Sequence, residues 1–177
     1  MCTGRRPLQL IVRTLCAQST TGIMQYGSFS MRCALGRTGQ RMRKREGDGA
    51  SPAGVWALRE AFYRSDRLMR PRTALPLRAI RRQDGWCDAS GDRIYNRRVT
   101  HPYPASAERL WRQDGLYDIV VVLGYNDRPR IKGRGSAIFL HCVRDGYEPT
   151  EGCIAVSRHD LLRLLPHLSG RMTLRIT

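Results

Sequence analysis

The feature that most restricts the fold of this chain is an unbroken apolar run, Ile119-Val120-Val121-Val122-Leu123. Its consecutive β-branched residues favour extended backbone, because branching at Cβ crowds the preceding turn of a helix. No polar residue alternates with the apolar ones, so both faces of such a strand must be covered. The run predicts a central strand over residues 118–126 and a domain built around a β-sheet.

Other segments carry weaker strand patterns. Partial alternation of apolar and polar residues predicts strands over residues 8–15, 22–34, 55–63, 138–143 and 172–176. Residues 55–63 also contain the helix formers Ala, Leu and Glu, so the same segment suits a helix. Residues 64–104 are interrupted by Pro71, Pro76, Pro102 and Pro104, which predicts a long ordered loop region with short strands. We expect Trp86 to pin this region to the core.

Two short helices are expected. Ser106 is a suitable N-cap for a helix over residues 106–112. Ser157, with Asp160 three positions later, resembles a capping box and opens a leucine-rich helix that ends at Pro166 or Gly170. The chain of 177 residues is long enough for one domain with a real core. These patterns predict a mainly β domain with two or three short helices.

The charge is strongly positive. The formal net charge is +16, and all but two of the 31 basic residues are arginine. Such a balance attracts polyanions, although an arginine-rich proteome would produce the same composition. The basic residues are scattered along the sequence rather than clustered, so we expect no specific nucleic-acid partner.

Cysteine spacing and hydropathy argue against several classes of protein. The six cysteines show no CxxC pair and no regular framework. His141 and Cys142 are adjacent, but neighbours on a strand point to opposite faces, so we expect no metal and no other cofactor. The apolar run after Arg6 is too short for a secretion signal, and no stretch is long enough to span a membrane.

Two residues form a candidate catalytic pair. His141 ends an apolar strand, and Cys153 follows Gly152 twelve positions later. A thiol is a strong nucleophile only as the thiolate, and a nearby imidazole can accept its proton. A glycine before the nucleophile lets backbone N–H groups approach a developing oxyanion. A free cysteine is more often a buried apolar residue, but Cys153 lies in a turn sequence between a strand and a capped helix.

The other histidines are weaker candidates for a base. His159 and His167 lie on or beside the closing helix, where we expect them at the surface. His101, in the long loop region, is the only other plausible base. In the glycine-rich segment 37–49, we expect Glu46 and Asp48 to be solvated or paired with Arg45.

The segment around His141 and Thr150-Glu151-Gly152-Cys153-Ile154-Ala155 resembles the signature of the L,D-transpeptidase (YkuD-type) catalytic domain, in a divergent branch. Further resemblance covers most of residues 30–177 and is carried by the segments 33–37, 44–54, 120–126 and 133–141. The resemblance implies a β-sandwich catalytic domain over residues 1–177, in which residues 1–30 form an N-terminal β-hairpin extension.

The resemblance also implies an activity. Members of this family act on peptidoglycan stem peptides in cell-wall biosynthesis and cell-shape maintenance, and carbapenems trap them. The cysteine attacks the carbonyl of a diaminoacid–D-alanine bond, D-alanine leaves, and an amine or water resolves the acyl-enzyme. Carried over to this sequence, Cys153 is the nucleophile and His141 the general base, and the backbone of Gly152 forms the oxyanion hole. The family often orients its histidine with a backbone carbonyl.

This sequence departs from the common signature at two positions. Glu151 stands where histidine is usual, and Ala155 stands where the common signature has an arginine that helps to hold the substrate carboxylate. Arg134, Arg158 or Arg97 could replace that arginine, because a guanidinium matches a carboxylate. Further substrate-binding candidates are Ser136, Tyr125, Asn126 and Thr150.

Three functions follow from these patterns. A cross-linking L,D-transpeptidase ranks first, a cysteine L,D-carboxypeptidase that only hydrolyses ranks second, and a basic polyanion-binding protein ranks third. The family implies a place in the periplasm or cell envelope, whereas the lack of a recognisable signal leaves a cytoplasmic location open.

Overall fold

The structure is a computed structural model that describes residues 9–177. Cys2, the Arg5-Arg6 pair and residue 8 of the first expected strand lie outside the described residues. The fold is mainly β, as predicted, with one α-helix, α1 (Arg158–Leu164), among the described residues. Two 3₁₀ turns complete the helical content, η1 (Asp145–Tyr147) and η2 (Leu165–His167).

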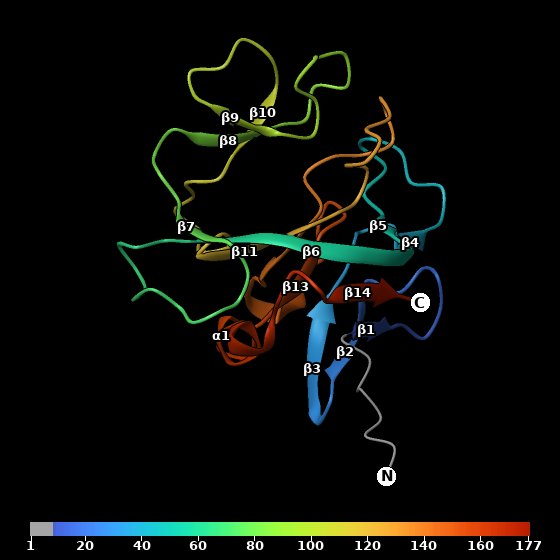
Figure 1. Cartoon of the computed structure of the whole chain (residues 1–177). Helices are drawn as coiled ribbons and strands as arrows, with labels where there is room; N and C mark the ends of the chain where they lie inside the picture. The colour runs from blue at the N-terminus through green and yellow to red at the C-terminus, as the bar shows by residue number, and fades with distance from the viewer. Residues whose placement is uncertain (1–8) are drawn as a thin grey trace.

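One large sheet makes up most of the fold (Figure 1). Its nine strands lie in the order β11 (Ile119–Leu123), β12 (Phe139–Cys142), β13 (Ile154–Val156), β3 (Phe29–Ala34), β2 (Thr21–Tyr26), β1 (Gln9–Arg13), β14 (Thr173–Ile176), β6 (Gly54–Tyr63) and β7 (Leu77–Ala79). The long strand β6 also pairs with β11, so the first strand of this order meets the last but one. The sheet thus folds over on itself, in agreement with the predicted sandwich-type fold.

The central strand β11 separates two apolar clusters, as its unbroken apolar run predicted. Ile119, Val121 and Leu123 belong to the larger core, which is completed by α1 and the inner faces of the other strands. Val120 and Val122 point the other way, into a second cluster with Phe139 and Trp86. Successive side chains of a strand alternate between its faces, so β11 is covered on both sides.

The second cluster lies beneath a small cap. The strands β8 (Asp84–Cys87), β9 (Arg98–Thr100) and β10 (Ala107–Arg109) form this three-stranded sheet, which stands at the top of Figure 1, beyond β6. Trp86 packs edge-on against Phe139, with the ring centroids 5.2 Å apart, and donates to Asn96 Oδ1 at 2.9 Å. Trp86 therefore pins this region to the core, as expected.

Two predicted elements differ in the structure. The helix expected over residues 106–112 is wrong: residues 107–109 form β10, because pairing with β8 satisfies this backbone in the cap. The single strand expected over residues 22–34 is also wrong. Gly27, with a φ of 56°, and Ser28 turn the chain so that Tyr26 pairs with Phe29, and β2 and β3 form a hairpin.

The other expected elements are present. Residues 54–63 form β6 rather than a helix, since β14, β7 and β11 all pair with it. Ser157 caps α1, with its Oγ accepting from the Asp160 N–H at 3.0 Å. Strand β1 lies between β2 and β14 in the large sheet. The remaining pair, β4 (Gln40–Arg41) and β5 (Ser51–Pro52), lies at the two ends of the loop 42–50. No helix within residues 9–177 is long and apolar enough to cross a membrane.

Candidate active site

Strand alternation and parallel pairing place His141 and Cys153 on one face of the sheet. Strand β13 pairs parallel with β12, so that His141 lies opposite Ala155 and Leu140 opposite Ile154. The loop 143–153 folds back to allow this pairing. Leu140 and Ile154 point into the larger core, so His141, Ala155 and Cys153 point to the other face, beneath the cap. His141 lies on β12, and Cys153 directly precedes β13. The two residues are therefore diagonal neighbours on adjacent strands.

The backbone fixes the orientation of the His141 ring. Its Nδ1 lies 2.8 Å from the carbonyl oxygen of Cys142, which can only accept a hydrogen bond. Nδ1 therefore carries the proton, and Nε2 keeps a free lone pair. Burial lowers the pKa of His141 to about 4, so the ring is neutral at pH 7 and able to accept a proton. Tyr117 packs edge-on against this ring at 5.2 Å.

The Cys153 thiol is protonated in the unliganded site. Burial raises its pKa to about 12, and the Glu108 carboxylate adds to the rise. The Phe139 N–H, 3.3 Å from Sγ, and the Lys44 ammonium act in the opposite direction. The thiol donates to the Ala137 carbonyl at 3.2 Å. Ala137 holds a positive φ of 52°, an unusual conformation for a residue with a side chain, which turns that carbonyl toward the sulfur.

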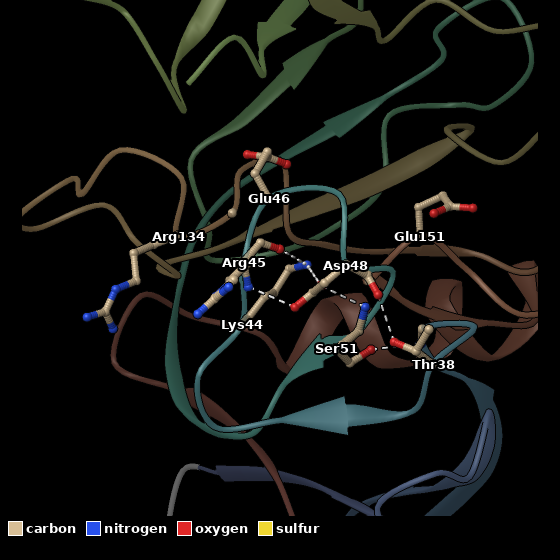
Figure 2. A network of polar contacts seen from close by, with 12 residues as sticks. Thr38, Lys44, Arg45, Glu46, Asp48, Ser51, Arg134 and Glu151 are labelled. Carbon is tan, nitrogen blue, oxygen red and sulfur yellow. Dashed lines mark hydrogen bonds and ion pairs between the residues drawn. The ribbon is translucent and has the colours of Figure 1, made fainter. Parts of the chain in front are cut away.

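A polar loop supports the turn that carries Cys153 (Figure 2). Lys44 is buried and donates to Asp48 Oδ1 at 2.6 Å, and Asp48 also accepts from the Ala50 N–H. We expected Asp48 to be solvated or paired with Arg45. Asp48 does accept from the Arg45 N–H at 2.7 Å, but it is not solvated, and its counter-charge is Lys44, because a buried ammonium requires a close counter-charge.

The same loop reaches the turn directly. Ser51 Oγ donates to the Cys153 carbonyl at 3.3 Å, and Thr150 Oγ1 donates to the same carbonyl at 2.6 Å. Gly152 has a φ of 131°, and a Cβ at this position would meet the Ala50 carbonyl at 2.7 Å and Lys44 Nζ at 3.3 Å. Only glycine fits this close approach. The Gly152 N–H donates to Thr150 Oγ1 at 3.1 Å.

His141 and Cys153 open into a cavity of about 630 Å³ between the large sheet and the cap. From the cap, Glu108 reaches into this cavity and accepts a hydrogen bond from the Tyr117 hydroxyl. Asp88 also lines the cavity, and its Oδ1 is buried with no hydrogen-bond partner among residues 9–177. Three arginines complete the basic part of the wall: Arg109, Arg112 and Arg144.

The structure gathers some of the expected substrate residues at this cavity. Ser136 and Thr150 line it, and Ser136 donates to Glu46 Oε2 at 2.8 Å. Tyr125 and Asn126 instead hold the loop 126–135: the Tyr125 hydroxyl donates to the Arg134 carbonyl, and the Asn126 side chain bonds Ile131 and Gly135. These two side chains are not among the residues that line the cavity.

The arginines proposed to hold a carboxylate lie elsewhere. The Arg134 side chain points away from the Lys44–Asp48 pair (Figure 2) and lines a separate, basic cavity. Arg158 pairs with Asp118 at 3.1 Å, and neither Arg158 nor Arg97 lines the cavity at Cys153. Glu151 sits at the rim in an exposed pair with Arg37. His159 is exposed, as expected.

Sequence patterns did not identify the residues that the cap contributes. Glu108 and Arg109 of the cap, and Arg112 and Tyr117 that follow it, are separated from the Cys153 turn by long stretches of chain, and no local spacing marks them; Arg144 lies in the same β12–β13 loop as Cys153 but was not singled out. Lys44 stood in a segment that carried the family resemblance, but its burial was not expected. No group of metal-ligating side chains occurs in the part of the chain that the structure describes.

Comparison with known families agrees with this geometry. The model of the YkuD family, the L,D-transpeptidase catalytic domain, matches residues 15–176. Searches of curated proteins and of solved structures gave no significant match. The match covers nearly the whole chain and includes the cavity with His141 and Cys153. The chain therefore belongs to the L,D-transpeptidase catalytic-domain family.

Proposed function

We propose that this protein is a peptidoglycan L,D-transpeptidase that transfers an acyl group from a stem tetrapeptide through Cys153. The observation that supports this most is one cavity that holds a buried thiol and a neutral imidazole on the same sheet face. In this proposal the protein works in the periplasm or cell envelope, where its polymer lies.

The reaction begins with proton transfer. As the substrate carbonyl approaches, the thiol proton passes to His141 Nε2, and the sulfur forms a bond to the carbonyl carbon. Backbone amides at the Gly152–Cys153 turn stabilise the resulting oxyanion. In this step the Gly152 N–H exchanges its bond with Thr150 Oγ1 for one with the oxyanion. Removing one such donor typically slows a reaction by about 10²–10³-fold.

The acyl-enzyme then forms and breaks down. The tetrahedral intermediate collapses, the C–N bond breaks, and D-alanine leaves with the proton that His141 held. An acceptor amine attacks the thioester, transfers a proton to His141 and releases the cross-linked product with the thiol restored. Water in place of the amine gives the carboxypeptidase reaction, which is the alternative within the same chemistry.

We propose Arg144 as the residue that holds the substrate carboxylate in place of the arginine replaced by Ala155. Arg144 lines the cavity, its side chain is 51% exposed, and its contacts with Asp114 and Glu148 are both long, at 3.5 Å. Such loosely held guanidinium groups can exchange one carboxylate for another at little cost. Arg112 is less available because Asp114 binds it closely.

Replacement of Cys153 tests the proposal. Cys153→Ser should lower D-alanine release from a tetrapeptide by at least about 10³-fold, because a hydroxyl is a far weaker nucleophile at this site. Cys16→Ser, which replaces an exposed free cysteine, is the matched control and should retain activity. A carbapenem should acylate Cys153 alone. Unchanged activity, or labelling at another cysteine, would refute the assignment. Mass analysis with and without an acceptor peptide separates cross-linking from hydrolysis.

Basic residues in the loops 43–45 and 132–134 favour a second, accessory function. A separate cavity of about 470 Å³ is lined by Arg43, Lys44, Arg45, Lys132, Gly133 and Arg134. The two loops that form it are tied by a hydrogen bond from the Glu46 N–H to the Gly133 carbonyl at 2.8 Å. Two short basic segments that are far apart in the sequence thus form one basic cleft. We propose that this cleft binds anionic polymer beside the active site.

A further inference from the structure

Two charges of opposite sign flank Cys153, and they differ in how well they are compensated. Lys44, beneath the Cys153 turn, is neutralised by Asp48 at 2.6 Å. Glu108 enters from the cap with its side chain 28% exposed, and its nearest cation, Arg112, is 3.9 Å away. Arg112 itself is bound closely by Asp114. The negative charge opposite the thiol is therefore the less compensated one.

We propose that Glu108 binds the free ammonium group of the substrate's diaminoacid, and that in the empty cavity the same carboxylate keeps the Cys153 thiol protonated. The identity of the substrate in this statement rests on the proposed function. The control of the thiol by Glu108 does not, and can be tested without substrate.

The effect of Glu108 on the thiol follows from electrostatics in a confined cavity. A carboxylate near a thiol opposes formation of the thiolate, and the low polarity of a buried site strengthens this effect. The Glu108 charge indeed contributes to the raised pKa of Cys153. A bound ammonium would cancel that charge, so that the thiolate forms more readily once the substrate is present. Cation binding and thiol deprotonation are then coupled, and the coupling is reciprocal.

The surroundings of Glu108 fit an ammonium group. The Tyr117 hydroxyl occupies one carboxylate oxygen. Burial raises the pKa of Glu108, and the Asp88 and Asp114 charges add to the rise, whereas Tyr117 and Arg112 lower it. Asp88 offers its own buried Oδ1, which has no partner among residues 9–177, as a second acceptor. An ammonium has three donors, and the two carboxylates of Glu108 and Asp88 can accept two of them.

The first experiment measures alkylation of Cys153 by the neutral reagent iodoacetamide, with the Cys153 peptide quantified by mass spectrometry. Glu108→Gln should raise the alkylation rate at pH 7 by about tenfold, because each unit by which the thiol pKa falls multiplies the thiolate fraction tenfold. Glu151→Gln removes the same charge at the exposed rim and should leave the rate unchanged. An equal rate in wild type and Glu108→Gln would overturn the control of the thiol by Glu108.

A second measurement uses the unaltered protein and does not depend on how the variant folds. Methylammonium chloride should accelerate alkylation of wild-type Cys153 relative to sodium chloride at equal ionic strength. The acceleration should vanish in Glu108→Gln. The same rate in both salts would contradict the proposal.

The substrate arm compares donor tetrapeptides with a free or an acetylated side-chain amine. D-alanine release is followed in the first turnover, which precedes attack of any acceptor on the thioester, so that acetylation tests only the donor's ammonium. Wild type should prefer the free amine by at least tenfold in kcat/KM, and Glu108→Gln should lose this preference. Equal processing of both peptides by wild type would refute ammonium binding. If wild type processes neither peptide, the proposed function fails, while the alkylation result still decides the role of Glu108.

Discussion

At the scale of single residues, the site depends on a histidine that stays neutral. The pKa of His141 is lowered from 6.5 to about 4 by burial, so kcat/KM should fall only as the pH drops through about 4. The same shift affects stability. Because the folded-state pKa lies below the unfolded one, the stabilising contribution is complete above pH 6.5 and is lost as the pH falls toward about 4, by about 3 kcal/mol. His141→Asn can keep the bond to the Cys142 carbonyl but cannot titrate. Chemical denaturation at pH 7 and pH 4 should show the larger loss in wild type, and equal losses would exclude this role.

At the scale of elements, the turn between β12 and β13 requires a glycine at one position. Gly152→Ala should cost about 1–3 kcal/mol for the backbone conformation alone. It should abolish activity as well, because its Cβ would collide with the Ala50 carbonyl at 2.7 Å and displace the Cys153 turn. Gly146→Ala is the matched control, since Gly146 also has a positive φ, of 77°, but nothing lies within 4 Å of its Cβ position. This control should lose some stability yet retain activity, as judged by thermal denaturation and D-alanine release. Similar activity losses in both variants would show that strain, and not the collision, is decisive.

At the scale of the whole molecule, we expect part of the net charge of +16 to act through the basic cleft between the loops 43–45 and 132–134. Binding of a phosphate-rich anionic polymer should weaken steeply as salt increases, because each neutralised charge releases a counterion. Replacing Lys132 and Arg134 together with glutamine should reduce the slope of log affinity against log salt concentration by about 1–2. Replacing Arg78 on β7 and Arg175 on β14, two arginines that do not line the cleft, is the matched control and should leave most of the slope unchanged. Fluorescence titration with polyphosphate at several salt concentrations measures this slope, and equal slopes for the two double variants would contradict specific binding in the cleft.

The sequence by itself determined most of the strand pattern and the choice of His141 and Cys153 as the candidate pair. The apolar run at residues 119–123 predicted a strand buried on both faces, and the period of two then sends His141 and Cys142 to opposite faces. Local signals also identified Ser157 as the N-cap residue of α1, because Ser157 and Asp160 interact within one turn.

Only the tertiary structure decided what surrounds that pair. Residues 106–112 carry a helix-capping signal, but pairing with β8 makes residues 107–109 a strand and delivers Glu108 to the cavity. Lys44 appears as one cation in a polar loop, yet the fold buries it against Asp48 beneath Gly152. Both outcomes depend on contacts between segments far apart in the chain. Local propensity amounts to a few tenths of a kcal/mol per residue, so sheet pairing and burial override it.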